Sequence, residues 1–416
     1  SGLIKGIGEK SAKKLVETFG KNTLEVIRKN PEKVARVPGI GKGKARLISI
    51  ALSNQSELDT LRRILVEKNI SPNLASKIYD RYGPRTLEIL KTDPYLLARE
   101  MFGIGFLTAD SIAMNMGISP DAPQRLKAGI YYALEHAADD GHCYLPQLEL
   151  IEKANQLLGL SEIQDLTDHL ESLIREDFII RDEDRIALRH IARAEEFVAK
   201  FIANRCGKSE TPHVPAEIVR RSLEIASSEL GVEFSAEQEQ AVFDTTAYPL
   251  LIITGGPGCG KTTIIRALAS LARVAEKRVL LCAPTGRAAQ RMAQVCGIDA
   301  CTIHRLLKYD PHRRAFQFGI DNPLSCDMII VDEASMIDIL LARDLFSAIP
   351  ADATVVLVGD KDQLPSVGPG RVFGELVSLS AVRTVSLSVL FRRSSESNIN
   401  PIAHTINSGI TPSIPE

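Results

Sequence analysis

The stretch from Gly255 to Thr262, Gly-Gly-Pro-Gly-Cys-Gly-Lys-Thr, has the residue types and spacing of a phosphate-binding loop. It matches the P-loop pattern G-x4-G-K-T and directly follows an apolar run at 250–254, which is typical of a buried parallel strand. In such a loop the backbone amides wrap the β-phosphate of a nucleotide, Lys261 neutralises the β/γ oxygens, and the Thr262 hydroxyl binds Mg²⁺. The predicted cofactors are therefore ATP and Mg²⁺. The residues predicted to hold them are Gly255, Gly256, Pro257, Gly258, Cys259, Gly260, Lys261, Thr262 and Thr263.

Two further apolar runs end in polar residues that nucleotide hydrolysis needs. The run at 328–331 ends in Asp332 and Glu333. We expect Asp332 to hold the Mg²⁺ and Glu333 to polarise the attacking water. The run at 354–358 leads into a stretch punctuated by glycine and proline, in which Gln363 is placed to sense the γ-phosphate.

The elements that must position these residues are strands alternating with helices. The apolar runs, together with a further one at 279–281, are separated by stretches such as 263–275, the expected helix whose N-terminus faces the phosphates. This alternation predicts an α/β fold with a parallel sheet. The 416 residues are enough for several domains, and 44% of them are hydrophobic. No apolar run approaches the ~20 residues that a membrane-spanning helix needs, so we expect no membrane partner.

The first third of the chain contains a repeat. The pattern G-I-G-x3-A-x2-(L/I) begins at Gly6, Gly39 and Gly103, and a fourth copy beginning at Asn69 lacks the glycines. The pattern predicts two short helices joined by a tight turn, in which glycine permits unusual backbone angles and a close approach to a ligand. The isoleucine is expected to pack inward. The amides at the start of the second helix can hold a phosphate.

The first two copies resemble the helix-hairpin-helix family, which grips the DNA backbone without reading sequence. Residues 1–50 hold 12 basic and 4 acidic side chains, a net of +8, although the whole chain has a net charge of −2. This positive segment favours phosphate contact. In the third copy Phe106 and Leu107 follow the turn where a lysine would serve DNA, so the third and fourth copies are expected to be scaffold. The predicted DNA-binding residues of the repeats are Gly6, Gly8, Lys10, Gly39, Gly41, Lys42 and Lys44.

The middle of the chain is predicted to be helical and to end in a β-hairpin. The apolar segments 178–180 and 185–188 flank an acidic turn and predict the hairpin, so that the region suggests a winged-helix-like module. Residues 111–230 hold 13 basic and 21 acidic side chains, a net of −8, which favours a packing or spacer role over phosphate binding. Helices are expected at 124–140, 146–158 and 163–176.

The P-loop, the Asp-Glu-Ala-Ser at 332–335 and the segment 359–370 together resemble the RecD-like branch of superfamily-one DNA helicases. The resemblance implies an ATP-dependent helicase that moves 5′ to 3′ on single-stranded DNA and separates duplexes. It implies that Gln238 contacts adenine and that Arg392 reaches the γ-phosphate from a second motor domain. It also implies contacts to single-stranded DNA from Thr285, Arg287, Thr302 and His304. The predicted catalytic residues are Lys261, Asp332, Glu333, Gln363 and Arg392.

The resemblance covers nearly the whole chain and implies four parts, of the kind found in stand-alone RecD-like enzymes. A hairpin near 306–322 within the first motor domain is expected to be the pin that splits base pairs, with a plain surface loop as the alternative. Both chain ends look like cuts, so the fragment is expected to bind nucleotide but to hydrolyse it poorly, because hydrolysis needs the cleft between both motor domains. The four parts are helix-hairpin-helix repeats (1–120), a winged-helix-like module (121–208), the first RecA-like motor domain (209–390) and the start of the second (391–416).

Two other functions stay open from the sequence. One is a DNA-anchoring adaptor whose ATPase is only a switch and which does not unwind. The other is a nuclease subunit, although no cluster of carboxylates and lysine is left over for that chemistry. The expected partners are single-stranded DNA and junctions of single- and double-stranded DNA, and the choice of DNA over RNA depends on the resemblance. The seven scattered cysteines predict free thiols in a reducing compartment, the cytoplasm.

Overall fold

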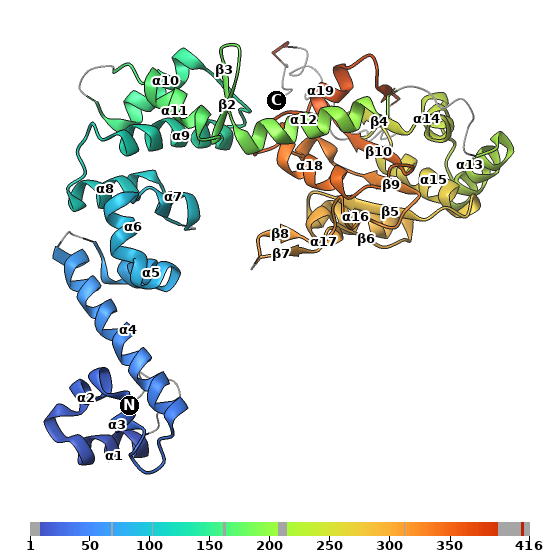
Figure 1. The fold of residues 1–416 in the computed structure, drawn as a ribbon. Helices are drawn as coiled ribbons and strands as arrows, with labels where there is room; N and C mark the ends of the chain where they lie inside the picture. Colours follow the sequence, from blue (N-terminus) through green and yellow to red (C-terminus); the bar gives the residue numbers. More distant parts are fainter. Residues whose placement is uncertain are drawn as a thin grey trace, which may run out of the picture. The chain divides into compact units, whose positions relative to one another are not determined.

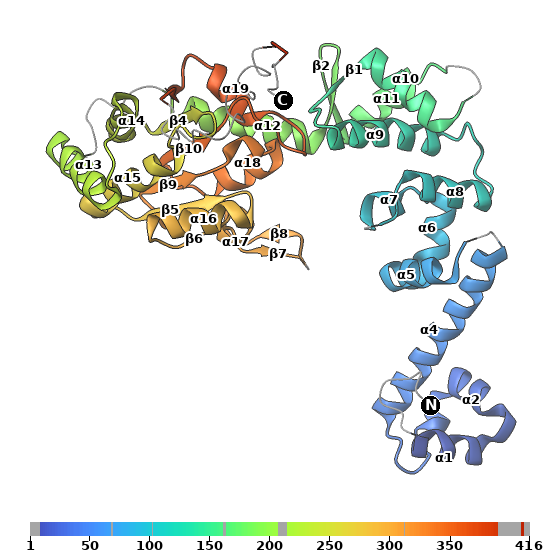
Figure 2. The same ribbon diagram turned by 180° about the vertical axis from the view of Figure 1, so that it is seen from behind.

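The structure is a computed structural model, and it describes residues 9–67, 70–101, 103–160, 164–206, 214–311, 313–389 and 409–411 (Figures 1 and 2). The chain divides into two compact units. The first comprises residues 1–132 with 152–171, and the second comprises residues 133–151 with 172–416. Across the described residues, no helix combines the length and the apolar composition needed to cross a bilayer.

The first unit contains two copies of one helical arrangement. Each copy runs helix, 3-10 turn, helix, short helix, Gly-Ile-Gly turn, helix. The copies share a local bond, because the Thr23 hydroxyl donates to Gly20 O at 2.6 Å and the Thr86 hydroxyl donates to Gly83 O at 2.8 Å. The repeating unit is therefore longer than the Gly-Ile-Gly pattern alone indicated. The elements are α1 (Glu9–Phe19), η1 (Gly20–Asn22), α2 (Thr23–Lys29), α3 (Pro31–Val34), α4 (Lys42–Glu67), α5 (Pro72–Tyr82), η2 (Gly83–Arg85), α6 (Thr86–Thr92), α7 (Leu96–Glu100) and α8 (Phe106–Met116).

The repeat positions form the cores of these copies, as the pattern predicts. Ile40, Ala45 and Ile48 are buried in one cluster with Leu15, and the third copy buries its own isoleucines and alanine in the same way. One expectation is wrong: α4 is not short but runs for 26 residues. After Gly43 in its first turn, α4 contains neither proline nor glycine, so nothing in the sequence ends it early.

The middle of the chain has the predicted helices and hairpin. The strands β2 (Ile179–Asp182) and β3 (Arg185–Leu188) pair antiparallel, and β1 (Leu145–Pro146) adds a third strand beside β3 that the sequence did not predict. Two residues are too few for a recognisable alternation of apolar and polar side chains. The helices are α9 (Pro123–Asp139), α10 (Gln147–Leu158), α11 (Thr167–Arg175) and α12 (Arg189–Ala203).

A six-stranded sheet in the order β11-β4-β10-β9-β5-β6 forms the centre of the second unit, and every pairing in it is parallel. The predicted α/β fold is confirmed, and the two edge strands were not predicted, because both carry polar residues and β6 is only three residues long. Helices α15 and α16 cover one face and α18 lies on the other (Figure 1). The strands are β4 (Leu250–Gly255), β5 (Val279–Ala283), β6 (Ala300–Thr302), β9 (Met328–Val331), β10 (Thr354–Gly359) and β11 (Arg383–Leu387). The helices are α13 (Ala216–Leu230), α14 (Ala236–Ala247), α15 (Lys261–Val274), α16 (Gly286–Cys296), α17 (Ile303–Leu306), η3 (Ala334–Met336), α18 (Ile339–Ser347) and α19 (Val372–Ser378).

Helix α12 is fixed to the motor fold through α18. The rings of Phe201 and Phe346 stack with centroids 4.5 Å apart. Arg205 lies over the Phe201 ring at 3.9 Å and donates from Nη2 to Pro350 O at 2.7 Å. An aromatic stack and a buried cation bonded to backbone carbonyls make a firm junction, so α12 is part of the same compact unit as the sheet.

Candidate active site

Four of the five predicted catalytic residues follow strands that end at the same, carboxyl-terminal edge of the parallel sheet; they are Lys261, Asp332, Glu333 and Gln363. In the strand register, Gly359 of β10 lies opposite Thr254 of β4, and Val331 of β9 lies opposite Leu357 of β10. Because all three strands point the same way, the P-loop, the Asp332-Glu333 pair and the Gln363 loop emerge side by side. The structure thus brings together what the sequence placed 102 residues apart, from Lys261 to Gln363.

Two different physical reasons favour glycine at positions of the P-loop. Gly258 and Gly260 have φ of 88° and 80°, in the left-handed region that favours glycine. A Cβ on Gly255 would lie 3.0 Å from the backbone oxygen of Leu387, so only glycine fits between the loop and β11. At Gly256 a Cβ would meet no described atom within 4 Å, so the backbone there is open to a phosphate. The loop can therefore present its amides at the N-terminus of α15.

Lys261 lies across the loop that it is predicted to serve. Its Nζ donates to the carbonyl oxygens of Gly255 and Gly256, the second at 3.0 Å. Thr262 and Thr263 follow in the first turn of α15. An ammonium held on the loop backbone is within reach of phosphate oxygens that enter the loop, which fits its predicted role.

Asp332 fits a cation site. Burial raises the pKa of its carboxyl to about 6, against the lowering effects of the Glu333 amide, Lys261 and Arg291. Asp332 Oδ1 accepts the Glu333 backbone N–H at 2.9 Å. A carboxylate that burial disfavours is stabilised by a bound cation, so Asp332 with the Thr262 hydroxyl suits the Mg²⁺ that ATP carries.

Glu333 stands in an unusual backbone conformation. Its φ is 52°, in the left-handed region, and the 3-10 turn η3 starts directly after it. For a non-glycine residue this conformation costs of order 1 kcal/mol and is concentrated at functional sites. The chain therefore leaves the course of β9 at Glu333, directly after Asp332.

Gln363 lies in the turn that follows β10. Its backbone N–H donates to Asp360 O at 3.3 Å, and Lys361 N donates to the Thr254 hydroxyl at 3.2 Å, which ties the start of this turn to β4. Asp360 itself is buried and its Oδ1 accepts the Asp362 N–H at 3.1 Å. The Gln363 side chain is exposed, so it is free to contact a group at the sheet edge.

Gln238 is buried at the start of α14 and caps that helix. Its Oε1 accepts the Ser235 N–H at 3.0 Å, and the Ser235 hydroxyl accepts the Gln238 N–H at 3.3 Å. Its Nε2 has no partner among the described residues. A buried amide donor without a partner is costly, and a ring nitrogen of adenine would satisfy it. The predicted adenine contact therefore fits the geometry.

Cys259 departs from the expectation that it faces the loop. Its side chain is 5% exposed and packs in the core cluster under the P-loop, and burial raises the pKa of its thiol. It therefore contributes its backbone amide rather than its sulfur to the loop. All seven cysteines are free thiols.

Two of the threonines predicted to contact DNA serve as helix caps. The Thr285 hydroxyl accepts the Ala288 N–H at 3.3 Å and the Thr302 hydroxyl accepts the Arg305 N–H at 3.2 Å. These bonds start α16 and α17. Arg287, one residue after the first cap, is exposed. The two threonines therefore fix the starts of α16 and α17 and so position exposed side chains beside them, such as that of Arg287.

His304 joins an aromatic cluster that the sequence did not reveal. Its ring lies 5.8 Å from Tyr309 and 5.5 Å from Phe316, and these two rings are 5.1 Å apart. Tyr309 and Phe316 face each other across the expected hairpin, which consists of β7 (Tyr309–Asp310) and β8 (Ala315–Phe316). The cluster joins α17 to the hairpin base. The sequence does contain a sign of this cluster, because aromatic residues occur in both strands of the expected hairpin.

The turn at Gly39–Gly41 matches its predicted form. Gly39 has φ of 90°, and a Cβ on Gly41 would meet no described atom within 4 Å. Lys42 and Lys10 are exposed, whereas Lys44 Nζ donates to the Ser11 hydroxyl at 3.4 Å. The turn is therefore open to a phosphate and has basic side chains around it. Gly6, Gly8 and Arg392 lie outside the described residues.

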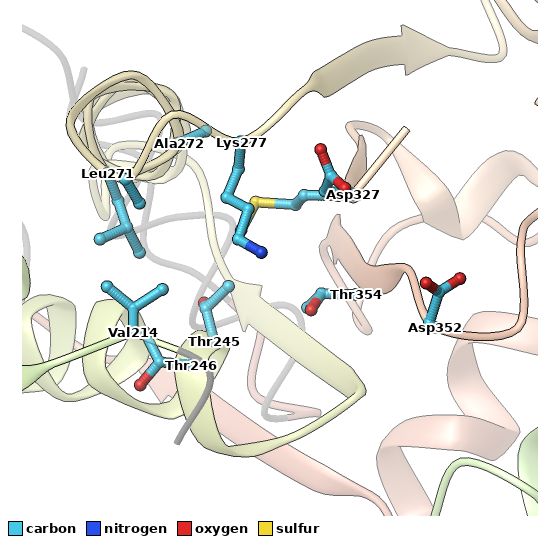
Figure 3. Close-up of a pocket in the computed structure, with 11 residues that line it drawn as sticks. Val214, Thr245, Thr246, Leu271, Ala272, Lys277, Asp327, Asp352 and Thr354 are labelled. Carbon is cyan, nitrogen blue, oxygen red and sulfur yellow. The ribbon is translucent and has the colours of Figure 1, made fainter. Parts of the chain in front are cut away.

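A cavity of about 200 Å³ lies at the opposite edge of the sheet (Figure 3). It is formed where β9 and β10 begin, at Met328 and Thr354, and the Lys277 side chain points into it. The P-loop follows the other end of β4, so this cavity is separate from the nucleotide site. Its lining mixes one lysine with Asp327 and Asp352 and with apolar residues.

Family models match three parts of the chain. They are a SAM-like helix-hairpin-helix tandem at residues 3–54, the ATP-dependent RecD2 DNA helicase HHH domain at residues 54–144, and an AAA domain at residues 238–369. The matches fall on the repeats and on the P-loop domain, in the order that the fold shows.

Curated relatives agree with these matches. The ATP-dependent RecD2 DNA helicase of Deinococcus radiodurans is 32% identical over 98% of this chain and 57% of its own length. The RecBCD enzyme subunit RecD of Mycobacterium tuberculosis is 36% identical over 42% of this chain and 34% of its own length. The ATP-dependent DNA helicase dda of Enterobacteria phage T4 is 33% identical over 29% of this chain and 28% of its own length.

Fold, site and relatives together define a class, the P-loop motor proteins with helix-hairpin-helix repeats in front of the motor. The chain is similar over nearly its whole length to a RecD2 helicase, and its helical repeats match the RecD2 family model. It spans a little over half, 57%, of the length of the RecD2 relative.

Proposed function

We propose that the protein of which this chain is part is an ATP-dependent DNA helicase. The observation that carries the proposal is the meeting of Lys261, Asp332 and Gln363 at one sheet edge, where a P-loop can present a nucleotide to them. ATP binding and hydrolysis would change this edge and so move a strand across the motor domain. The DNA substrate is supported by the DNA helicases among the relatives.

In the proposed mechanism Lys261 holds the β/γ-phosphate oxygens and the loop amides hold the β-phosphate. Thr262 and Asp332 bind Mg²⁺, which would neutralise charge that develops on the phosphates. Glu333 orients and polarises the attacking water, and Gln363 contacts the γ-phosphate. Gln238 donates to adenine and so fixes the base.

The direct test replaces Lys261 with alanine in the intact helicase. We expect Lys261→Ala to abolish ATP hydrolysis and unwinding, because the P-loop then has no cation on the β/γ oxygens. The matched control is Lys277→Ala, the same change in an exposed lysine at the other edge of the sheet. Normal unwinding by Lys261→Ala would overturn the mechanism.

Direction and DNA structure form a finer part of the proposal. We propose movement from 5′ to 3′ on single-stranded DNA and unwinding at its junctions with duplex, within the cytoplasm. Duplexes with a 5′ tail should be unwound and duplexes with a 3′ tail should not. Unwinding only from 3′ tails would contradict the assigned direction.

We also propose that the 416-residue chain binds ATP but hydrolyses it slowly. Arg392 is expected to act from the second motor domain, and the chain covers 57% of its RecD2 relative. A fluorescent ATP analogue should bind the chain with an affinity close to that of the intact helicase. Equal rates of DNA-stimulated hydrolysis in the two proteins would contradict this expectation.

A test on the hairpin β7–β8 distinguishes the helicase function from the adaptor alternative. Its tip carries Arg313, whose side chain is 85% exposed, and Arg314, with φ of 50°. We propose that this hairpin is the pin. Replacing residues 311–314 with two glycines should stop strand separation and leave DNA-stimulated hydrolysis intact. If unwinding survives this replacement, the hairpin is a surface loop; if the parent protein hydrolyses ATP without unwinding, the adaptor reading holds.

A further inference from the structure

The loop that carries Gln363 is held at both ends but not in its middle. Its first end is tied to β4 by the Lys361 N–H. In the middle, Leu364 and Val367 are 87% and 88% exposed, so the loop has little packing of its own there. Gln363 lies between these two ends, bonded through its backbone N–H to Asp360 O at the first, so the place where the second end is fixed limits the paths that the loop beyond Gln363 can take.

That second end rests on the segment 141–143, which connects α9 to β1. The Gly370 N–H donates to Gly141 O at 3.0 Å. The Ser366 hydroxyl donates to Gly370 O at 2.8 Å, which closes the loop onto the same point. A residue far earlier in the chain thus supplies the acceptor that ends the Gln363 loop.

The contact is tight enough to require glycine. Gly370 has φ of 90°, in the left-handed region. A Cβ there would lie 3.1 Å from Cys143 Sγ and 3.2 Å from the Cβ of Ile339, and the Ile339 N–H donates to Pro369 O at 2.8 Å. The loop end is therefore clasped between the segment 141–143 and the start of α18.

The segment 141–143 has support behind it. Burial, and then the nearby carboxylate of Glu195 of α12, raise the pKa of the Cys143 thiol, which places this segment beside α12. Helix α12 is in turn fixed on α18 by the Phe201–Phe346 stack and by the Arg205 bond to Pro350 O. A displacement of the loop end would have to move this junction, so the segment acts as a fixed point.

On the basis of the proposed ATPase, we propose that Gly141–Cys143 is a positioning element for Gln363. It fixes the loop end so that Gln363 stands where the γ-phosphate will lie, without itself touching the nucleotide. The winged-helix-like part of the chain thereby sets the rate of hydrolysis in the motor. The P-loop cradle does not depend on this contact, so nucleotide affinity should be independent of it.

The first test adds one methyl group at the contact in the intact helicase. Gly370→Ala should lower kcat for DNA-stimulated hydrolysis by about tenfold, since a tenfold rate change corresponds to a small misplacement of a catalytic group. KM for ATP and the affinity for ADP, which has no γ-phosphate, should stay at the parent values. The matched control is Gly374→Ala within α19, where a Cβ would be 3.8 Å from Arg371 Nη2.

A second variant enlarges the side chain on the other side of the contact, at Cys143, and leaves the loop sequence unchanged. Cys143→Leu should displace Gly370 and give the same fall in kcat with unchanged ADP affinity. Cys143→Ser keeps about the same side-chain size, so it should hydrolyse ATP at the parent rate. It also controls for any effect of thiol chemistry.

The outcomes separate this proposal from the proposed function. Parent kcat in folded Gly370→Ala and Cys143→Leu, as judged by an unchanged melting temperature, would overturn the positioning role. A loss of ADP affinity together with kcat would also overturn it, because the contact would then support the P-loop rather than Gln363. If the parent protein neither binds ADP nor hydrolyses ATP, the proposed function fails instead.

Discussion

The two Gly-Ile-Gly turns that lie within the described part of the first unit, at Gly39 and Gly103, have the same backbone conformation and opposite surroundings. Gly39 and Gly103 have φ of 90° and 84°, and both turns start a helix one residue after their second glycine. At Gly41 the position of a Cβ is open among the described atoms, whereas at Gly105 it would lie 2.9 Å from the Tyr132 hydroxyl. One backbone motif thus serves two purposes, which the residues around it decide.

Position by position, the difference is largest in the residue after the second glycine. Lys42 is exposed, and its counterpart Phe106 is 1% exposed. The Phe106 ring lies 5.8 Å from Tyr95 and 5.3 Å from Tyr132, so an aromatic row covers the turn. The open turn is left for a phosphate, and the covered turn holds its neighbours together.

A buried ion pair adds to the covered turn. Asp110 of α8 accepts two bonds of 2.8 Å from the Arg125 guanidinium and one of 2.7 Å from the Tyr95 hydroxyl. Arg125 also donates to Leu158 O at 2.9 Å. Burial, followed by the bond to Asp110, raises the pKa of Tyr95, which keeps its phenol protonated as a donor. Asp110, Arg125 and Tyr95 are therefore bonded to one another and to nearby backbone, which holds the elements around the covered turn together.

The largest expected effect comes from the aromatic row. Phe106→Ala should lower the free energy of unfolding by about 3–5 kcal/mol, because it leaves a cavity in the core. The affinity for DNA of the folded variant should be unchanged. Lys42→Ala at the matching position should leave the free energy of unfolding unchanged and weaken DNA binding. Urea unfolding measures the stability of both variants, and a DNA titration measures their affinity. A Phe106→Ala protein that is stable but fails to bind DNA would break the comparison.

The second largest effect on stability is expected from the ion pair between Asp110 and Arg125. Asp110→Ala leaves the buried Arg125 without its carboxylate and should cost about 3 kcal/mol of stability. A matched control is Asp80→Ala, which removes an exposed carboxylate from α5. Thermal unfolding of both variants gives the difference. Equal melting temperatures would mean that the network contributes nothing to the covered turn.

Charge should matter only at the open turn. Lys42→Ala combined with Lys44→Ala should weaken DNA binding about tenfold at low salt and reduce the slope of log affinity against log salt by about 2, one for each lost phosphate contact. Lys91→Ala, an exposed lysine of α6, should change neither value. An unchanged salt slope in the double variant would show that these lysines do not contact phosphate.

Much of the nucleotide site follows from local sequence, and the rest does not. Apolar runs that end in Gly255, Asp332 and Gly359 predict parallel strands whose ends meet, because a buried strand must be apolar on both faces. The capping role of Gln238 was also within reach, since Ser-x-x-Gln before a helix is a capping box. The aromatic side chains that cover the turn at Gly103–Gly105 could not be predicted. Tyr132 is 27 residues from Gly105, and no local sequence pattern indicates a contact over that distance.

The smallest predicted effects come from the paired glycines, and they test the comparison most directly. Gly105→Ala should lower the free energy of unfolding by about 1–2 kcal/mol, because its methyl group must push against the Tyr132 hydroxyl. Gly41→Ala has open space and should leave stability within about 0.5 kcal/mol of the parent. The same methyl group should nonetheless weaken DNA binding at Gly41, because it occupies the space in which a phosphate would approach the turn amides. Gly105→Ala should bind DNA as the parent does. If Gly41→Ala binds DNA normally while Gly105→Ala does not, the open and covered turns have been assigned the wrong way round.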